Sequence, residues 1–266
     1  MLTIGASSAC FYPDVTEESF IRLCKMNVKT AEIFFNSPSE LEDSFTSLLK
    51  SYAEEYGVSI TAVHPFMSFA EHYNLFSNYE RRFYDYMPLY LKLFEVAAKL
   101  GAKYFVFHGA KPSASSSDEL YFERFAILSE KAAQMGVICA QENVVHYRSQ
   151  YPDFMQRMKK AIGENFRMVL DIKQARRTGV DPFLFFDAVG ESIEHIHISD
   201  FNDKKDCITP LKGKFDFKEF FIETIKRGYK GDYIIELYRD SYKDAAEIEE
   251  AFLKLQKIMG EIKEGL

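Results

Sequence analysis

The chain has 266 residues, with 33 basic and 40 acidic side chains, and therefore a net charge of −7 at neutral pH. Its 47% hydrophobic and 27% charged residues exclude a disordered chain and a collagen-like repeat, and four cysteines are too few for a disulfide scaffold. The acidic balance disfavours a broad nucleic-acid-binding surface, because neutralising phosphates takes clustered lysines and arginines.

The cysteines and the N-terminus bear on the cellular compartment. The four cysteines are far apart and form no C-x-x-C pair, which disfavours a zinc ribbon or a thioredoxin motif and predicts reduced thiols. The first residues, MLTIGASSACFYPD, have no basic segment before their short apolar run, unlike a signal peptide. No apolar stretch approaches the ~18 residues of a membrane span. We therefore expect a soluble, cytoplasmic protein without a membrane partner.

Short apolar runs alternate with longer amphipathic segments along the whole chain. The runs are continuously hydrophobic and rich in Val, Ile and Phe, which is typical of strands covered on both faces. The segments between them, such as YLKLFEVAAKLG and EIEEAFLKLQKIMGEI, have apolar residues at the three- and four-residue spacing of helices. In chain order the runs are residues 2–7, 30–35, 59–66, 103–110, 137–144, 166–172, 193–201 and 232–238.

The number and order of these elements predict the fold. Eight strands and eight helical segments in this length make roughly 33 residues per unit, the size of a βα repeat. We therefore predict an α/β fold, a single-domain (β/α)8 TIM barrel over residues 1–266. A doubly wound sheet is the rival fold, but no glycine-rich phosphate loop follows the first strand.

Ionisable side chains gather toward the C-terminal ends of the predicted strands, which is the face where barrels build active sites. Strand alternation places Glu142 on the same face as Ala140, and Asp171 on the same face as Val169. For any one such residue, a salt bridge or a hydrogen-bonded core histidine is the simpler interpretation. Six of them at six strand ends predict an active site. They are His64, His108, Glu142, Asp171, His197 and Glu236.

Three carboxylates and one histidine of this set predict a cation. Carboxylates that converge on one barrel mouth repel one another, and their burial is unfavourable unless they are paired, hydrogen-bonded or bound to metal. A divalent ion resolves this conflict, and three oxygen ligands with one nitrogen suit Mn²⁺, Mg²⁺, Co²⁺ or Zn²⁺. We predict one such ion as the cofactor.

A histidine and several basic residues near the predicted ligands need separate interpretation. His195 shares a strand face with the second histidine of HIH but lies one layer deeper, which favours a structural role. Lys173 lies near Asp171, and strand alternation turns it toward the surrounding helices, with its ammonium reaching outward. In the alternative, Lys173, Arg176 or Arg177 reaches over the barrel mouth to hold a phosphate or a carboxylate.

The strand-end motifs together resemble the xylose-isomerase-like TIM barrels. That superfamily includes sugar-phosphate isomerases and epimerases, ketose 3-epimerases, hydroxypyruvate isomerases, inosose dehydratases and apurinic endonucleases of the endonuclease-IV type. The resemblance extends in consistent order from Leu2 to about Tyr238, which is nearly the whole chain. The motifs that carry it are VHPF, VFHGA, QENV, LDIKQARRTGVDP, HIHISD and IIELY.

The resemblance implies roles for individual residues. In the epimerase branch a Glu, an Asp, a His and a second Glu hold a single divalent metal, and the two glutamates also form the acid/base pair on either side of the substrate. The matching residues here are Glu142, Asp171, His197 and Glu236. His64 and His108 match histidines that contact substrate in some branches and bind further metals in the endonuclease branch. The candidate substrate-binding residues are His64, His108, Gln174, Lys173 and Arg176.

Two differences from the family's motifs help to decide to which branch of the superfamily the chain is similar. Family members often carry D-x-x-H after the sixth strand, whereas this chain has Gln174 at the fourth position, and an amide replaces an imidazole ligand poorly. The endonuclease branch has a D-x-H pair before a P-x-G-x-G stretch, where this chain has Lys205 and Cys207. A trinuclear site would lose three ligands, which disfavours apurinic endonuclease activity and a nucleic-acid partner.

These residues predict a metal-dependent isomerase or epimerase of a ketose, a sugar phosphate or a related hydroxy-carbonyl compound. The metal would acidify the C–H beside the carbonyl and stabilise an enediolate, while one glutamate removes the proton and the other returns it. Two alternatives stay open: a metal-dependent dehydratase (a lyase of the inosose-dehydratase type), and a non-catalytic sugar-binding barrel with a decayed site. The expected partner is a small sugar or sugar phosphate, and 15% aromatic residues are compatible with a homo-oligomer.

Overall fold

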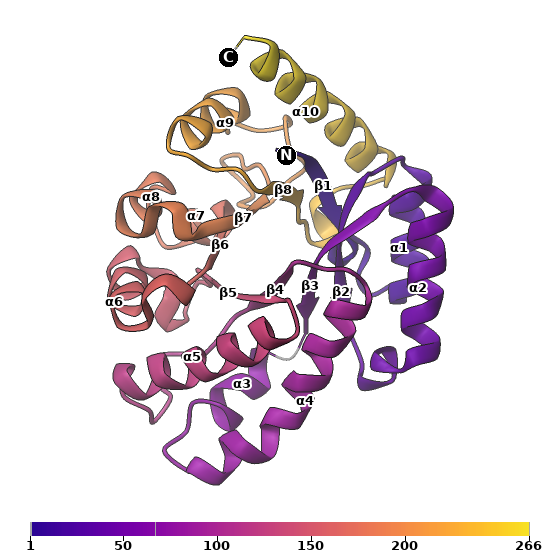
Figure 1. Ribbon diagram of the computed structural model, residues 1–266. Coiled ribbons are helices and arrows are strands. Elements are labelled where there is room, and N and C mark those ends of the chain that lie inside the picture. Colours follow the sequence, from indigo (N-terminus) through magenta and orange to yellow (C-terminus); the bar gives the residue numbers. More distant parts are fainter. Residues whose placement is uncertain (1, 67, 266) are drawn as a thin grey trace.

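The structure is a computed structural model that describes residues 2–66 and 68–265. Eight parallel strands pair in sequence order and close into a barrel in which the eighth strand lies beside the first. Figure 1 shows the helices arranged around the outside of this ring of strands. The predicted single-domain (β/α)8 barrel is confirmed, and the domain limits 1–266 stay a prediction.

The strands are short, and each falls within one of the predicted apolar runs. They are β1 (Ile4–Ser7), β2 (Thr30–Phe35), β3 (Ser59–Pro65), β4 (Tyr104–Phe107), β5 (Ile138–Glu142), β6 (Met168–Asp171), β7 (Ile193–Ile198) and β8 (Asp232–Ile235). Helices follow every strand. They are α1 (Thr16–Lys25), α2 (Asp43–Tyr56), α3 (Ser68–Asn74), α4 (Glu80–Lys99), α5 (Asp118–Gln134), α6 (Pro152–Ile162), α7 (Ile172–Arg177), α8 (Phe183–Val189), α9 (Phe217–Lys226) and α10 (Ala246–Glu264).

Local chemistry at the helix ends agrees with the sequence. Ser117 caps α5, and its hydroxyl accepts a hydrogen bond from the Leu120 N–H. Gly57 ends α2 with a φ of +63°, a left-handed conformation that glycine adopts without strain. Among the described residues, no helix combines the length and the apolar composition needed to cross a membrane.

The core has two parts. The larger part lies between the strands and the surrounding helices and is rich in phenylalanine and tyrosine. A separate small cluster consists of Val106, Ala140 and Val169, one residue from each of three consecutive strands. By strand alternation Ala140 and Val169 point the same way as Glu142 and Asp171, which lie two residues further on. Aliphatic side chains therefore fill the barrel interior beneath the layer of ionisable residues.

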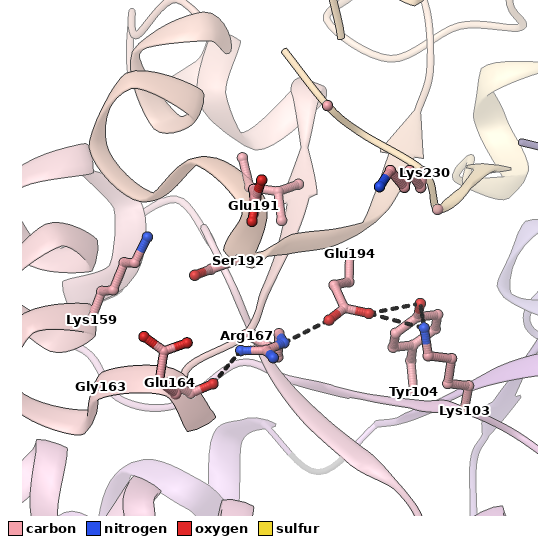
Figure 2. Close-up of a pocket in the computed structure, with 13 residues that line it drawn as sticks. Lys103, Tyr104, Lys159, Gly163, Glu164, Arg167, Glu191, Ser192, Glu194 and Lys230 are labelled. Carbon is pink, nitrogen blue, oxygen red and sulfur yellow. Dashed lines mark hydrogen bonds and ion pairs between the residues drawn. The ribbon is translucent and has the colours of Figure 1, made fainter. Parts of the chain in front are cut away.

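The N-terminal end of the barrel carries a cavity of about 520 Å³ with charged walls (Figure 2). Glu194, in β7, lies at its centre. Its carboxylate accepts hydrogen bonds from Arg167 Nε at 2.6 Å, from Lys103 Nζ at 3.0 Å and from the Tyr104 hydroxyl at 3.1 Å. This acid is fully paired by its immediate neighbours.

Candidate active site

The four residues predicted as metal ligands converge at the C-terminal end of the barrel. Glu142 and Asp171 are the last residues of β5 and β6, His197 lies in β7, and Glu236 directly follows β8. One potential ligand atom from each lies within 4.8 Å of the corresponding atoms of the others. The side chains are buried, and even Glu236 is only 9% exposed. Parallel pairing brings them together, since β6 and β7 place Asp171 opposite His197.

Asp171 is oriented by the start of helix α7. Its Oδ1 accepts hydrogen bonds from the backbone N–H groups of Lys173, at 2.6 Å, and Gln174, at 3.1 Å, as an N-cap residue does. The Asn143 side chain bonds to the Asp171 backbone on both sides, accepting from its N–H and donating to its carbonyl oxygen. With Oδ1 held by two donors, Oδ2 is the oxygen left for the centre of the site.

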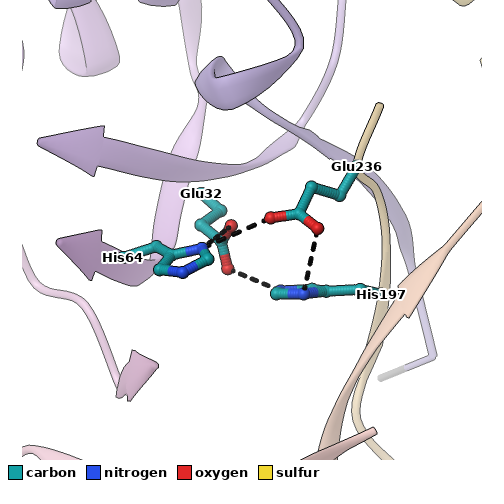
Figure 3. Close-up of side chains that lie close together, drawn as sticks. All are labelled: Glu32, His64, His197 and Glu236. Carbon is teal, nitrogen blue, oxygen red and sulfur yellow. Dashed lines mark hydrogen bonds and ion pairs between the residues drawn. The ribbon is translucent and has the colours of Figure 1, made fainter. Parts of the chain in front are cut away.

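Glu32, in β2, is a fully buried carboxylate that connects three histidines. Its Oε2 lies 3.1 Å from His195 Nε2 and 3.0 Å from His197 Nε2, and its Oε1 lies 3.5 Å from His64 Nδ1. Figure 3 shows that His64 and His197 each contact both Glu32 and Glu236. Because an ionised carboxylate only accepts, Nε2 of His197 donates and its Nδ1 faces Glu142 and Glu236.

His64 and His108 lie directly beside the predicted ligands. Their Nε2 atoms are 2.7 Å apart, and His108 Nε2 is also 2.7 Å from Glu142 Oε2. Burial acts to lower the pKa of His64, but the Glu236 and Glu32 carboxylates outweigh it and raise that pKa to about 10. The two carboxylates therefore favour the protonated form of the His64 ring.

Burial and neighbouring charges oppose each other in setting the carboxyl pKa values. Burial raises the pKa of Asp171 to about 6, with the Lys173 ammonium opposing this shift and the two nearby glutamates adding to it. Burial acts in the same direction on Glu142, but two neighbouring imidazoles outweigh it and hold its pKa below the usual value. At Glu236 the Lys173 ammonium is the largest opposing charge, and the pKa is well below its usual range. Both glutamates are therefore ionised and able to accept a proton.

Several buried polar atoms in this cluster have no hydrogen bond, although such atoms are rare in folded proteins. Three of the four predicted ligand residues contribute one. A set of three carboxylates and one imidazole with free atoms fits a divalent cation. These atoms have ionic neighbours but no hydrogen bond, and they include Glu32 Oε1, Glu142 Oε2, Asp171 Oδ2, His64 Nδ1 and His197 Nδ1.

A cavity of about 910 Å³ opens above the cluster and is mainly lined by aromatic and other apolar groups. Phe66 and Tyr238 both line it. Phe35, at the end of β2, is 1% exposed and packs near Phe45 in the core. The cavity brings His64, His108, Glu142 and Glu236 to its floor, which makes their polar groups accessible to a small molecule.

Most of this chain matches the model of one protein family. The family model described as xylose isomerase-like TIM barrel matches residues 22–258. The chain belongs to this family. No curated protein matches the chain in its sequence.

Solved structures share the fold of this xylose isomerase-like barrel at low sequence identity. A D-tagatose 3-epimerase-like protein superposes with a TM-score of 0.80 at 20% identity, covering 99% of each chain. A 3-keto-D-glucoside 4-epimerase from E. coli has a TM-score of 0.77 at 17% identity, covering 97% of this chain and 100% of that one. D-psicose 3-epimerase from Clostridium cellulolyticum H10 has a TM-score of 0.76 at 15% identity, covering 96% and 97%.

Lys173 corrects one sequence-based expectation for this xylose isomerase-like barrel. The prediction that its side chain turns toward the outer helices is wrong: Lys173 is 3% exposed, and its Nζ lies 2.9 Å from Glu236 Oε2 and 3.2 Å from Asp171 Oδ2. The chain enters helix α7 at residue 172, so strand alternation no longer sets the direction of the side chain.

Gln174 and Arg176, the other two candidate substrate-binding residues, lie in different places. Gln174 lines the cavity, and its Oε1 accepts a hydrogen bond from the Val145 N–H, so it also holds the loop after β5. The Arg176 guanidinium lies 3.3 Å from the centroid of the Phe201 ring and lines an adjoining cavity of about 510 Å³. The structure therefore places Arg176 outside the wall of the barrel cavity.

Glu32 and Glu71 are two buried acids that the sequence reasoning missed. Glu32 interrupts the apolar run TAEIFF, and an acid inside such a run indicates a buried carboxylate with polar partners. Glu71, in α3, accepts hydrogen bonds from the Tyr90 hydroxyl at 2.7 Å and from the Gly109 N–H at 2.6 Å, so it supports the turn that follows His108.

Proposed function

We propose that this protein is a divalent-metal-dependent epimerase or isomerase of a free ketose. One observation carries the proposal: Glu142 and Glu236 enter one cluster from β5 and β8, on different sides of the barrel, with ligand atoms within 4.8 Å of each other. Two carboxylates on different sides of a bound sugar are what removal and return of a proton require.

The four proposed metal ligands are Glu142, Asp171, His197 and Glu236. A divalent ion held there would supply positive charge beside the oxygen atoms of a hydroxy-carbonyl substrate and so lower the pKa of the adjacent C–H. One of the two glutamates takes the proton from that carbon, and the other returns a proton to the resulting enediolate. Return on the opposite face gives the epimer, and return at the neighbouring carbon gives the isomer.

The walls of the cavity favour an uncharged sugar over a sugar phosphate. The Lys173 ammonium is already paired with two carboxylates, and Arg176 lies outside the cavity. Arg239 is the other basic residue of the lining, and the acidic residues Glu142, Glu236 and Asp240 outnumber these two cations. Aromatic side chains, among them Phe66 and Tyr238, offer surfaces for the C–H faces of a sugar, while His64 and His108 offer hydrogen bonds to hydroxyls. Two of the structural neighbours named above are a D-psicose 3-epimerase and a 3-keto-D-glucoside 4-epimerase, and the third is described as D-tagatose 3-epimerase-like, which supports a keto sugar as the proposed substrate.

Solvent-isotope exchange tests the proposal. The Mn²⁺-loaded protein is incubated in D₂O with ketohexoses and ketopentoses, free and phosphorylated, and the products are read by NMR. We expect one deuterium on the carbon beside the carbonyl and formation of the epimer or isomer from a free ketose. The absence of exchange from every sugar at full metal occupancy would overturn the proposal. Loss of a hydroxyl instead would identify the dehydratase reaction.

A further inference from the structure

Lys173 competes with the proposed metal for the same oxygen atoms. Asp171 Oδ1 is held by two backbone N–H groups, so Oδ2 is the oxygen that Asp171 can offer to an ion. Lys173 Nζ lies 3.2 Å from this Oδ2 and 2.9 Å from Glu236 Oε2. An ammonium therefore already contacts two of the four ligand residues, inside a site that the unsatisfied atoms mark as built for a cation.

The burial of Lys173 and Asp171 strengthens the repulsion between the ammonium and a bound metal ion. Lys173 is 3% exposed and Asp171 is 1% exposed, so little water screens their charges from a third charge placed between them. A divalent ion on Asp171 Oδ2 would lie within a few ångströms of the ammonium and be repelled by it. The metal-free protein, in turn, gains a counter-ion for Asp171 and a further one for Glu236, which also lies 3.3 Å from His64 Nδ1.

The surroundings offer the ammonium an alternative position. Lys173 Nζ lies 4.6 Å from the centroid of the Tyr238 ring, which attracts a cation over its face. Tyr238 is 44% exposed and lines the cavity, so a rotation of the lysine side chain in that direction leads toward the cavity mouth. Lys173 itself lines the cavity, so the space that a displaced ammonium would enter lies beside it.

We propose that Lys173 is a built-in competitor of the divalent ion, which occupies the ligand carboxylates in the metal-free protein and is displaced when the ion binds. It would lower the affinity of the site for metal while keeping the metal-free barrel stable. This inference rests on the metal-binding part of the proposed function.

Calorimetric titration with Mn²⁺ tests the inference on the full chain. We expect Lys173→Met to bind Mn²⁺ at least about tenfold more tightly than the wild type, because a unit positive charge is removed from the ligand oxygens. The metal-free variant should also unfold at a lower temperature than the metal-free wild type, and Mn²⁺ should raise its melting temperature by more. Lys103→Met, at the opposite end of the barrel, is the matched control and should leave Mn²⁺ affinity unchanged.

The outcomes separate the two proposals. Equal Mn²⁺ affinity of the wild type and Lys173→Met overturns the competition and leaves the proposed function standing. Binding to neither protein overturns the metal-dependent function and the competition with it, whereas binding to Lys173→Met alone supports the competition and contradicts metal dependence of the wild type. Should Lys173→Met not fold, a crystal structure of the wild type with Mn²⁺ decides. Lys173 Nζ still in contact with both carboxylates beside the bound ion would overturn the inference.

Discussion

The two ends of the barrel use the same residue types to opposite effect. At the N-terminal end, the Glu194 carboxylate is shared by Arg167, Lys103 and Tyr104, and its charge is paired (Figure 2). At the C-terminal end, buried acids outnumber the ammonium groups beside them, and oxygen and nitrogen atoms are left without hydrogen bonds. Pairing of the first kind stabilises a fold, whereas unpaired buried charge lowers stability unless a ligand binds there.

The two cavities of the barrel differ in how well the buried polar groups beside them are satisfied. A cavity of about 520 Å³ with many charged residues lies at the N-terminal end, yet both carboxylate oxygens of its central acid accept hydrogen bonds. The cavity above the unsatisfied cluster is larger, at about 910 Å³. Unsatisfied buried groups, more than the presence of charge, therefore distinguish the candidate active site.

The largest expected difference between the two ends is in catalysis. Glu236→Gln keeps the shape of the side chain but removes the basic carboxylate, so we expect the rate of deuterium exchange to fall about 10²–10⁴-fold. Glu194→Gln, at the N-terminal end, should leave the exchange rate unchanged. Metal content measured on the same samples separates loss of the base from loss of the ion. Equal rates for the two variants would contradict the acid/base role of Glu236.

Two glycines with positive φ should differ in how well they tolerate a methyl group. A Cβ on Gly109, at the C-terminal end, would lie 1.8 Å from the Tyr121 hydroxyl oxygen, so Gly109→Ala should lower the free energy of unfolding by about 2–4 kcal/mol. Gly136, before β5 at the N-terminal end, has open space around the corresponding position, so Gly136→Ala should cost about 1 kcal/mol. Urea unfolding of the metal-free proteins measures both. Equal losses would mean that Tyr121 moves aside freely.

Glu32 is expected to act through His197. Glu32→Gln replaces one accepting oxygen with an amide nitrogen, which weakens the hold on the His197 Nε2–H, so we expect Mn²⁺ affinity to fall about 10–100-fold. Glu164→Gln, beside the N-terminal cavity, is the control. Nitrogen-15 NMR should report a change in the protonation pattern of the His197 ring in the first variant. An unchanged NMR pattern together with unchanged affinity would exclude this positioning role.

The smallest expected effect is a difference in pH dependence. Burial raises the pKa of Glu71, so its contribution to stability falls as the pH rises above about 4.3, the ordinary value for glutamic acid. Burial also acts to raise the pKa of Glu194, but Lys103 and Arg167 outweigh it and lower that pKa, so the contribution of Glu194 falls as the pH drops below the same value.

Paired variants isolate these two contributions. The difference in free energy of unfolding between the wild type and Glu71→Gln should fall with rising pH by on the order of 1 kcal/mol. The corresponding difference between the wild type and Glu194→Gln should fall with decreasing pH. Urea unfolding of the metal-free proteins between pH 3 and 7, about the range of carboxyl titration, measures both differences. Slopes of the same sign would contradict the opposite environments of the two acids.

Much of the fold and half of the site followed from local patterns in the chain. Continuous apolar runs predicted the strands, because parallel strands covered on both faces must be apolar along their length. The position of Glu142, Asp171 and Glu236 at the ends of such runs then placed them at one face of the barrel. No contact between distant residues was needed for that step, since parallel strands carry their C-terminal ends to the same side.

Contacts across and around the closed barrel were beyond the reach of spacing along the chain. Glu32 of β2 meets His195 and His197 of β7, and His64 of β3 meets His108 after β4, because closure and stagger of the strands set which side chains face each other. Lys173 turns inward because the chain becomes helical at residue 172.

By itself, therefore, the sequence determined the eight-stranded barrel and the four carboxylate and histidine positions at its C-terminal face. The tertiary structure alone set the partner of each buried charge: Glu194 accepts three hydrogen bonds, whereas Glu142 Oε2 and Asp171 Oδ2 have only the ionic neighbours His108 and Lys173. The reason is that the two properties depend on different separations along the chain. Hydrophobic periodicity is a local property of the chain, whereas the pairing of buried charges depends on distances between strands that are far apart in sequence.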